Sequence, residues 1–564
     1  MLYPLSILVI EEKVMNAERK NARRILVAAL ALTVLAGLLS AQQGPQTVAE
    51  ATGYKATSRH ADVMAFIREI QRLSPLVRVE TLCTSPEGRE VPLLVVGKPA
   101  PLSPFGLKAD KRMVVYIQAN IHAGEVEGKE ASLMLLRDIV LDPKTPYLDK
   151  LILLIAPIFN ADGNERISPE NRSDQPGPEQ GVGVRPNGQN LDLNRDSIKL
   201  ESPELRGLVR NVLTRWDPAL VVDCHTTDGA FHEETVTWSW PMNPNGDLPL
   251  LEFQRQEMLP AVNRIMKGKY GTLGLPYGGF RDWKAPEKGW ETFEPQPRYV
   301  TNYVGLRNRL SILDENYVHA DFKTRVLGNY FFLRAILDYA ADHADELTRL
   351  VADADQRTVR KGLAPADSDM FGVEYELRPL DEPVTIHGYE TAVIERPGTW
   401  PEMKRTDRKK TYTIPYYADY RVKRGVRFPF AYLLPAADAE VVGKLLQHGI
   451  SLERLETPAK LEVQVFLPKE IKGADQPYQG HRMNTVKGEY APETREFPAG
   501  TVLVRTAQPL GALAAYLLEP ESDDGLLAWN FFDRYVVAQW GRGYQAYPVF
   551  KLLSPTNFVT TAIE

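Results

Sequence analysis

Two histidines and a glutamate in the first half of the chain have the types and spacing of metal ligands. His122 and Glu125 lie three residues apart, where an apolar run ends and a helical pattern begins, and His225 ends a second apolar run. Three such ligands leave a zinc ion one open position for water, which is typical of a catalytic site. Asp223 precedes His225 by two residues, so both should point to the same face of a strand. Whether Asp223 is a further ligand or a partner of His225 stays open.

The apolar runs that carry these residues have the length of buried strands. Four of them are expected at the centre of a sheet, over residues 112–120, 151–159, 219–224 and 309–313. Helical patterns, such as the one over 126–140, alternate with them. This predicts an α/β fold with a mixed, largely parallel central sheet flanked by helices. Ligands bind beyond the carboxyl ends of the strands in such sheets, so we expect the polar residues there to lie together.

Further polar motifs follow in a fixed order: an N-x-D-G motif, an arginine followed by D-x-N-R, and a glutamate on a late strand. They are Asn160–Gly163, Arg185, Asp192–Arg195 and Ile312–Glu315. With the HxxE pair and the lone histidine, this order resembles the carboxypeptidase A-like zinc metallopeptidases over roughly residues 55–345. The resemblance implies a zinc carboxypeptidase fold and hydrolysis of C-terminal residues from peptides.

The resemblance also implies which residues hold the metal. His122, Glu125 and His225 would bind one Zn²⁺ ion, in the His₂Glu set that is known for carboxypeptidase A. Asp192 would support His122 through the other nitrogen of its ring.

The same resemblance implies the catalytic groups. Glu315 would be the general base, which takes a proton from the attacking water and delivers it to the leaving amine. Its neighbour Asp314 is the competing candidate, and strand alternation allows only one of the two into the site. Arg185 would face the developing oxyanion. Arg166 and Arg172 lie in the same loop region and are the alternatives to Arg185.

Substrate contacts follow from the resemblance as well. Asn194 and Arg195 would bind the terminal carboxylate, because a guanidinium offers paired donors to it. A tyrosine upstream of the glutamate would contact the substrate. We assign this role to Tyr303, with Tyr299 as the alternative.

The resemblance places the side-chain pocket along residues 298–309. This segment contains Arg298, Arg307 and Arg309. One buried arginine there would favour substrates that end in an acidic residue or a peptidoglycan diamino acid. Arginines on the surface, the commoner case, would have no such effect.

Together these residues predict a zinc metallocarboxypeptidase whose substrate is a peptide with a free C-terminus. Two other functions stay open. One is an amidase or deacylase that acts on muropeptides or N-acyl amino acids. The other is a catalytically silent protein that binds envelope material, against which the intact ligand set and Glu315 argue.

The first 41 residues have the pattern of a signal peptide, with an upstream extension before Met15. Basic residues precede an apolar run over 25–39, and Ser40-Ala-Gln follows it. The run is shorter than the roughly 20 residues that span a bilayer. We therefore expect a secreted or periplasmic protein with no membrane span after cleavage, an uncleaved anchor being the alternative.

Composition limits the remaining classes. The 564 residues include 67 Lys+Arg and 73 Asp+Glu, for a formal net charge of −6. A weakly acidic chain argues against nucleic-acid binding, which requires a basic surface. Two cysteines exclude a disulfide-rich scaffold, and we expect both Cys83 and Cys224 to be free thiols.

Residues 366–564 lie outside the peptidase pattern. A helical pattern over 335–365 separates them from the catalytic domain predicted over 55–345. Alternating patterns and short helical ones predict an α+β or β-rich accessory domain. Its basic stretch over 404–427 is interpreted as a solvated strand face in preference to a contact with a glycan or anionic polymer. Contact with the cell envelope through this domain is a further interpretation.

Overall fold

The computed structural model describes residues 44–563 except 105–109, 143, 228, 395–401, 436–438, 538–540 and 542. The predicted signal peptide over residues 1–41 lies outside the described residues. No helix within the described ranges is long and apolar enough to cross a membrane.

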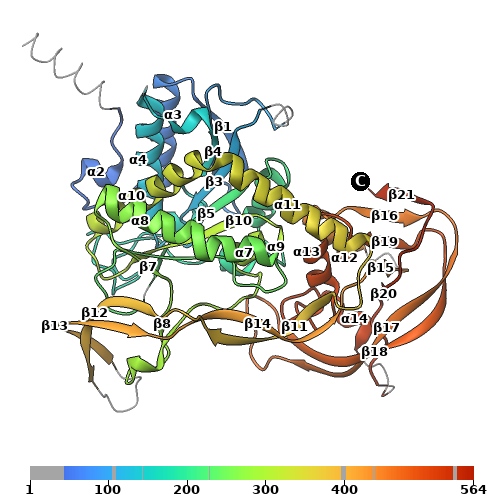
Figure 1. Ribbon diagram of the computed structural model, residues 1–564. Coiled ribbons are helices and arrows are strands. Elements are labelled where there is room, and N and C mark those ends of the chain that lie inside the picture. The colour runs from blue at the N-terminus through green and yellow to red at the C-terminus, as the bar shows by residue number, and fades with distance from the viewer. Residues whose placement is uncertain are drawn as a thin grey trace, which may run out of the picture.

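Among the described residues, eight strands form the central sheet, in the order β1-β2-β4-β3-β5-β10-β6-β7 (Figure 1). The four central strands, β4, β3, β5 and β10, run parallel to one another. β1 and β2 pair antiparallel with their neighbours, and β6 pairs antiparallel with β10 and parallel with β7. The strands are β1 (Val77–Thr84), β2 (Glu90–Val96), β3 (Met113–Ala119), β4 (Leu151–Ala156), β5 (Leu220–Thr227), β6 (Val236–Ser239), β7 (Gly274–Pro276) and β10 (Leu310–Tyr317). The predicted mixed, largely parallel sheet is confirmed.

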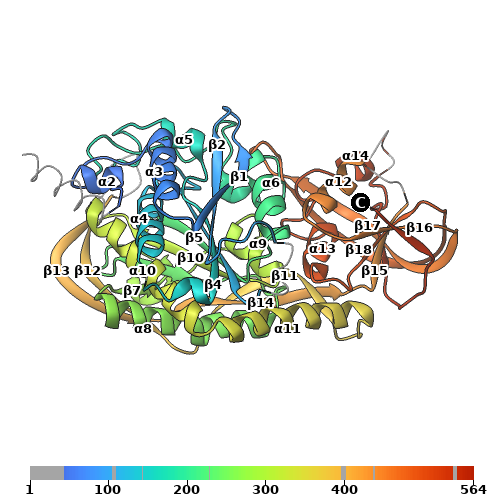
Figure 2. The same ribbon diagram turned by 90° about the horizontal axis from the view of Figure 1, so that it is seen from above.

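Alternate side chains of the central strands enter two different cores. Val222 and Ile312 face a core made with helices α3, α4, α8 and α10, whereas Val221 faces a core made with α6 and α9. Figure 2 shows these helices on the two sides of the sheet. The helices are α3 (His60–Leu73), α4 (Glu127–Leu141), α6 (Pro203–Gly207), α8 (Leu259–Tyr270), α9 (Val300–Leu306) and α10 (Phe322–Asp342).

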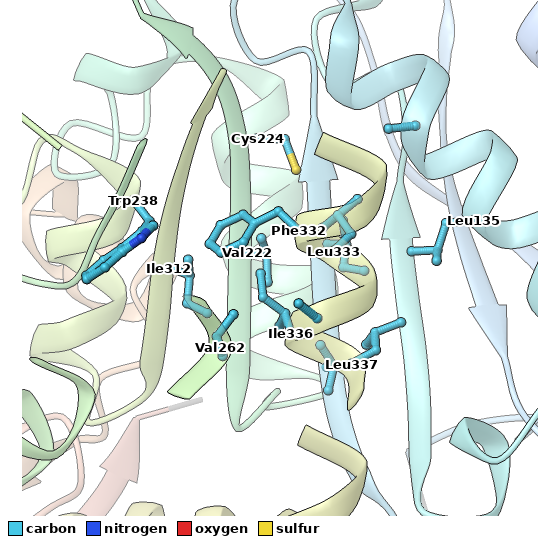
Figure 3. Packing of buried hydrophobic residues seen from close by; sticks show 14 of the residues in the cluster. Leu135, Val222, Cys224, Trp238, Val262, Ile312, Phe332, Leu333, Ile336 and Leu337 are labelled. Carbon is cyan, nitrogen blue, oxygen red and sulfur yellow. The ribbon is translucent and has the colours of Figure 1, made fainter. Parts of the chain in front are cut away.

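Helix α10 covers the centre of the first face. Figure 3 shows Phe332, Leu333 and Ile336 of this helix beside Val222 and Ile312 of the sheet. These side chains are fully buried. Each buried aliphatic side chain of this size contributes about 1.5–3 kcal/mol of hydrophobic free energy, so this layer holds the central strands firmly in place.

Two central strands are longer than predicted. β5 continues through His225 to Thr227, and β10 continues through Glu315 to Tyr317. The two strands pair in parallel with Glu315 opposite His225, and β6 pairs with β10 on its other side, with Thr237 opposite Glu315. The backbones of these polar residues pair with the neighbouring strands. The candidate functional residues therefore lie within the strands and not in the loops that follow them.

The C-terminal part begins after α11 (Ala344–Leu363). It contains a two-stranded ribbon and, among the described residues, a seven-stranded sheet in the order β18-β17-β20-β15-β19-β16-β21. Its further elements are β11 (Met370–Pro379), β12 (Val384–Ile394), β13 (Glu402–Ile414), β14 (Tyr416–Arg427), β15 (Ala431–Leu434), α12 (Ala439–Gln447), β16 (Leu452–Leu455), β17 (Ala459–Gly473), β18 (Asn484–Phe497), β19 (Val502–Arg505), α13 (Gly511–Leu518), α14 (Asp533–Val536), β20 (Phe550–Leu552) and β21 (Thr560–Ile563). The predicted additional β-rich region is confirmed.

The C-terminal part packs closely on the catalytic part. Strand β14 pairs with β9 (Trp290–Glu291), a short strand from the middle of the chain, and β8 (Gly279–Phe280) extends the same sheet. One hydrophobic core includes Val221, Val304, Tyr432 and Leu513, from both parts. The domain boundary between 345 and 366 stays a prediction, and the core crosses it without a break.

Candidate active site

Three side chains converge at the carboxyl edge of the central sheet. His122 and Glu125 lie in the turn between β3 and α4, and His225 lies on β5. One ligand atom from each of the three residues lies within 4.8 Å of the other two. The two Nδ1 atoms of the histidines are 3.2 Å apart, and oxygens of Glu125 lie 3.1 Å from His122 Nδ1 and 2.9 Å from His225 Nδ1.

The backbone between β3 and α4 brings the first two residues into place. Asn120 adopts a left-handed conformation with φ 65°, and its side-chain amide donates to the carbonyls of Ala123 and Glu125. In the first turn of α4, a Cβ added to Gly128 would lie 2.5 Å from Cβ of Cys224. The absence of a side chain at Gly128 therefore lets the helix that follows Glu125 approach the strand that carries His225.

A carboxylate lies behind each imidazole. Asp192 Oδ1 is 3.1 Å from His122 Nε2, as the resemblance implied, and Asp223 Oδ2 is 2.9 Å from His225 Nε2. In metal sites such partners keep the proton on the outer nitrogen of a ligand histidine, and the Nδ1 lone pair is then directed at the ion. Of the two roles that the sequence left open for Asp223, a further ligand or a partner of His225, its position behind the ring fits the partner.

These donors fit a zinc ion. Two ligand nitrogens at about 2.1 Å from a tetrahedral ion lie about 3.4 Å apart, close to the separation of the two Nδ1 atoms. His122, Glu125 and His225 are at most 4% exposed. Two imidazoles and a carboxylate that converge in a buried site, each imidazole supported from behind, form a suitable zinc ligand set.

Charge within the cluster keeps Glu125 anionic. Burial alone would raise its pKa, but His122 and Arg172 lower the pKa well below its usual range. Burial would lower the pKa of His225, yet Asp223 and Glu125 raise it well above its usual value. Burial likewise acts to raise the pKa of Asp192, and contact with His122 and Arg185 lowers it far below normal. The carboxylates that raise the pKa of His225 would equally favour a metal cation between the two imidazoles.

The neighbouring carboxylates Asp314 and Glu315 point to opposite faces of β10, as alternation predicts. Glu315 lines a cavity of about 250 Å³ together with the His-Glu-His cluster. Asp314 is fully buried on the other face, where its Oδ2 accepts a hydrogen bond from Asn329 at 2.7 Å. Burial raises the pKa of Asp314 well above its usual value. Of the two carboxylates, only Glu315 lines this cavity.

Two arginines bracket the carboxylates of the cluster. Arg185 Nε donates to Asp192 Oδ2 at 2.7 Å, and its guanidinium lies 3.8 Å from Glu125. Arg172 donates to Glu125 Oε1 at 3.0 Å and to the carbonyl of Thr226 at 2.7 Å. Both line the cavity. Arg166 instead pairs with Glu87 outside it.

Asn194 and Arg195 lie on the wall of the same cavity. Asn194 Oδ1 accepts from the backbone of Val300 at 2.9 Å, which leaves its amide nitrogen 3.4 Å from His225 Nε2. The Arg195 guanidinium lies 4.3 Å from the centre of the Tyr299 ring and donates to the carbonyl of Asn194. Among the described residues, no carboxylate lies within ion-pair distance of Arg195.

The structure differs from the prediction at Tyr303. This side chain is 1% exposed, and its hydroxyl lies 2.7 Å from Nδ1 of His448, away from the cavity. Tyr299, the alternative, lines the cavity. Tyr299 is the N-cap residue of α9, whereas Tyr303 lies one turn inside the helix, where its hydroxyl meets His448 of the C-terminal part.

The arginines of 298–309 do not form the predicted side-chain pocket. Arg298 lies 3.0 Å from Asp524, and Arg309 pairs with Asp217 and Asp355 at 2.7 and 2.9 Å. Arg307 donates to the carbonyl of His448 at 2.7 Å. None of the three lines the cavity beside the cluster. They join the catalytic part to α11 and the C-terminal part, and Arg307 and Arg309 are buried there.

Some lining residues had no signal in the sequence that we recognised. These are Thr226, Thr227, Tyr277, Phe293, Thr301 and Leu313. Thr226 and Thr227 directly follow His225 on its strand and could have been inferred from that position. Tyr277 and Phe293 lie in a stretch without periodicity, where only the three-dimensional path of the chain brings them to the site.

Comparisons with known proteins agree with this geometry. Residues 63–211 match the model of the zinc carboxypeptidase family. Carboxypeptidase 2 of Trichophyton equinum is 22% identical over 489 residues, which cover 83% of this chain and 81% of that protein. Carboxypeptidase 2 of Trichophyton rubrum is 21% identical over 512 residues, which cover 86% and 87%.

Solved structures with similarity include two carboxypeptidases. The metallo-carboxypeptidase of Pseudomonas aeruginosa, in complex with (2-guanidinoethylmercapto)succinic acid, gives a TM-score of 0.37 at 20% identity, over 50% of this chain and 68% of that chain. The carboxypeptidase A of Helicoverpa armigera gives a TM-score of 0.38 at 16% identity, over 51% and 74%.

The family match and the buried His-Glu-His cluster together support a zinc-dependent hydrolase. The family match identifies residues 63–211 as part of a zinc carboxypeptidase domain. The predicted family, the enzyme class of zinc metallocarboxypeptidase and the zinc cofactor are thereby confirmed. The match ends before His225 and Glu315, so their assignments rest on the geometry described above.

Proposed function

We propose that the protein removes C-terminal residues from peptides and acts outside the cytoplasm. The observation that carries the proposal is the position of Arg195. Its guanidinium has no carboxylate partner among the described residues and lines the same cavity as the His-Glu-His cluster and Glu315. A cation of this kind is suited to hold a terminal carboxylate at a fixed distance from the metal.

His122, Glu125 and His225 would hold the zinc ion. When bound, zinc supplies Lewis-acid activation of the scissile carbonyl and of the attacking water. Glu315 takes a proton from that water as its oxygen attacks the carbonyl carbon, and then gives the proton to the leaving amine as the C–N bond breaks. Arg185 stabilises the negative charge that develops on the carbonyl oxygen. Asn194 and Arg195 orient the substrate terminus, and Tyr299 supports the guanidinium of Arg195.

Export is proposed on the N-terminal sequence, in which basic residues precede a short apolar run. The fungal relatives share most of the chain length, and their names support the same reaction. Contact with the cell envelope through residues 366–564 stays a prediction.

The test compares a peptide that ends in a free carboxylate with the same peptide as its C-terminal amide. The free acid is expected to be cleaved at least about tenfold faster, because a charge-assisted hydrogen bond contributes about 1.5–3 kcal/mol. Product masses from the purified protein give both rates. Equal rates would overturn the exopeptidase proposal and favour the amidase.

A further inference from the structure

A tight turn of the C-terminal part reaches the active site. It consists of Tyr478–His481, between β17 and β18, and is closed by hydrogen bonds between the backbones of Tyr478 and His481 at 2.7 and 3.0 Å. Both ends are anchored. The ring of Tyr478 stacks on Trp529 with 6.2 Å between the ring centres, and His481 Nε2 lies 2.8 Å from Glu201 of the catalytic part.

The two central residues of the turn have left-handed backbones. The φ angles are 49° at Gln479 and 83° at Gly480, which is the requirement of a type I′ turn. Glycine adopts this conformation freely, but glutamine is strained in it, and asparagine is the residue that such a turn favours at the first position. Strain of this kind is retained where a side chain is needed for another purpose.

The side chain of Gln479 contacts the segment that supports the metal site. Its Oε1 accepts a hydrogen bond from the backbone N–H of Asp192 at 2.8 Å. In the part of the chain that the structure describes, this N–H has no other acceptor. The remaining contacts of Asp192 all go to the site. Oδ1 faces His122 and accepts from the backbone of Asn194, and Oδ2 accepts from Arg185.

We propose that Gln479 is a positioning residue of the active site: it fixes Asp192, and through Asp192 the ring of His122 and the Asn194–Arg195 segment. The inference rests on the proposed function for its kinetic consequence. Its consequence for metal affinity follows from the structure alone. The C-terminal part then supplies one of the supports of the catalytic centre, beyond packing against it.

The test replaces Gln479 with asparagine. Asparagine suits the turn better, which offsets part of the free energy lost with the hydrogen bond, but its side chain is one methylene shorter and cannot reach Asp192. We expect kcat/KM to fall about tenfold, with most of the loss in kcat, because partners behind a metal ligand typically contribute about 10–100-fold. Zinc affinity, measured by competition with a chromophoric chelator, should fall by about the same factor.

Gln508→Ala is the matched control. Gln508 Oε1 also accepts from a backbone N–H at 2.8 Å, that of Ser451, but within the C-terminal part. This variant should lower the melting temperature and leave kcat/KM and zinc affinity at the wild-type values. Gln479→Ala should lower both kcat/KM and zinc affinity, as Gln479→Asn does.

The outcomes separate the two proposals. A wild-type protein that cleaves no peptide would overturn the proposed function, and zinc affinity would still decide the role of Gln479. Wild-type kcat/KM and zinc affinity in Gln479→Asn would overturn the inference. Equal losses of kcat/KM in Gln479→Asn and Gln508→Ala would overturn it too, because the effect would then be general destabilisation.

Discussion

Two groups of arginines in this protein differ in burial and in the partners that they contact. The cleft group, Arg172, Arg185 and Arg195, surrounds the cavity beside the His-Glu-His cluster. The boundary group, Arg298, Arg307 and Arg309, joins the catalytic part to α11 and the C-terminal part. Residue type does not distinguish them. The difference is that Arg195 of the cleft group has no carboxylate partner among the described residues, whereas each boundary arginine contacts a carboxylate or a carbonyl of the protein.

This comparison predicts that changes at the cleft alter turnover and that changes at the boundary alter stability. The largest effect is expected for Glu315→Gln. Loss of the general base should lower kcat by about 10³-fold, since such a group typically contributes 10²–10⁴-fold. Zinc content should remain at one ion, as measured by atomic absorption. His225→Ala and exhaustive chelation should remove both zinc and activity, and full activity in Glu315→Gln would exclude Glu315 as the base.

Arg195→Met tests the cleft group directly. Truncating one partner of a buried charge pair costs at least about 2 kcal/mol, so kcat/KM for a free-acid peptide should fall about 30- to 100-fold. The rate for the matching C-terminal amide should change little. The two rates, measured in parallel, therefore approach each other. If the preference for the free acid survives in Arg195→Met, another residue binds the terminal carboxylate.

Arg309→Met tests the boundary group. The change removes the partner of Asp217 and Asp355 and should lower the free energy of unfolding by about 1–2 kcal/mol, because both carboxylates retain some contact with water. Urea denaturation gives this value. The kcat/KM of the folded variant should equal that of the wild type, and a selective loss for acidic C-terminal residues would restore the specificity role that the sequence suggested.

The smallest expected effect is on the pH dependence of stability, through Glu201 at the boundary between the two parts. Burial acts to raise the pKa of Glu201, but its contacts with His481 and Lys199 lower the pKa to about 2. A depressed carboxylate pKa stabilises the folded state above the unfolded value near 4.5, and this contribution is lost as the pH falls towards 2. Between pH 4.5 and 2 the wild type should therefore lose about 1 kcal/mol more of its free energy of unfolding than Glu201→Gln does. This figure allows for the partial exposure of Glu201. Acid titration followed by circular dichroism measures the difference.

Most residues of the candidate site could be predicted from the sequence because they lie at or near the ends of strands. His122, Glu125, His225 and Glu315 follow or end apolar runs, and parallel strands bring such positions to one edge of the sheet. Alternation along β10 also separated Glu315 from Asp314 correctly. The central sheet was predictable for the same reason, since its strands are continuous apolar runs with helices between them.

The features that could not be predicted from the sequence depend on contacts between distant parts of the chain. Tyr299 caps the short helix α9 and Tyr303 lies within it, and only the position of His448 shows that Tyr303 is directed away from the cavity. The carboxylates Asp355 and Asp524, which engage the boundary arginines, lie far away in the sequence. Gln479 shows the same limit, because nothing in its neighbourhood in the sequence indicates that it contacts Asp192.

The core that extends from the catalytic part into the C-terminal part has a consequence for how proteolysis would affect the protein. A protease that cut the chain near residue 365 would leave Val304 and its neighbours exposed to water once the halves separated. Neither half would then retain its buried surface, and the Gln479 contact would be lost in the same event. Limited proteolysis at this junction should therefore inactivate the enzyme without releasing a smaller active fragment.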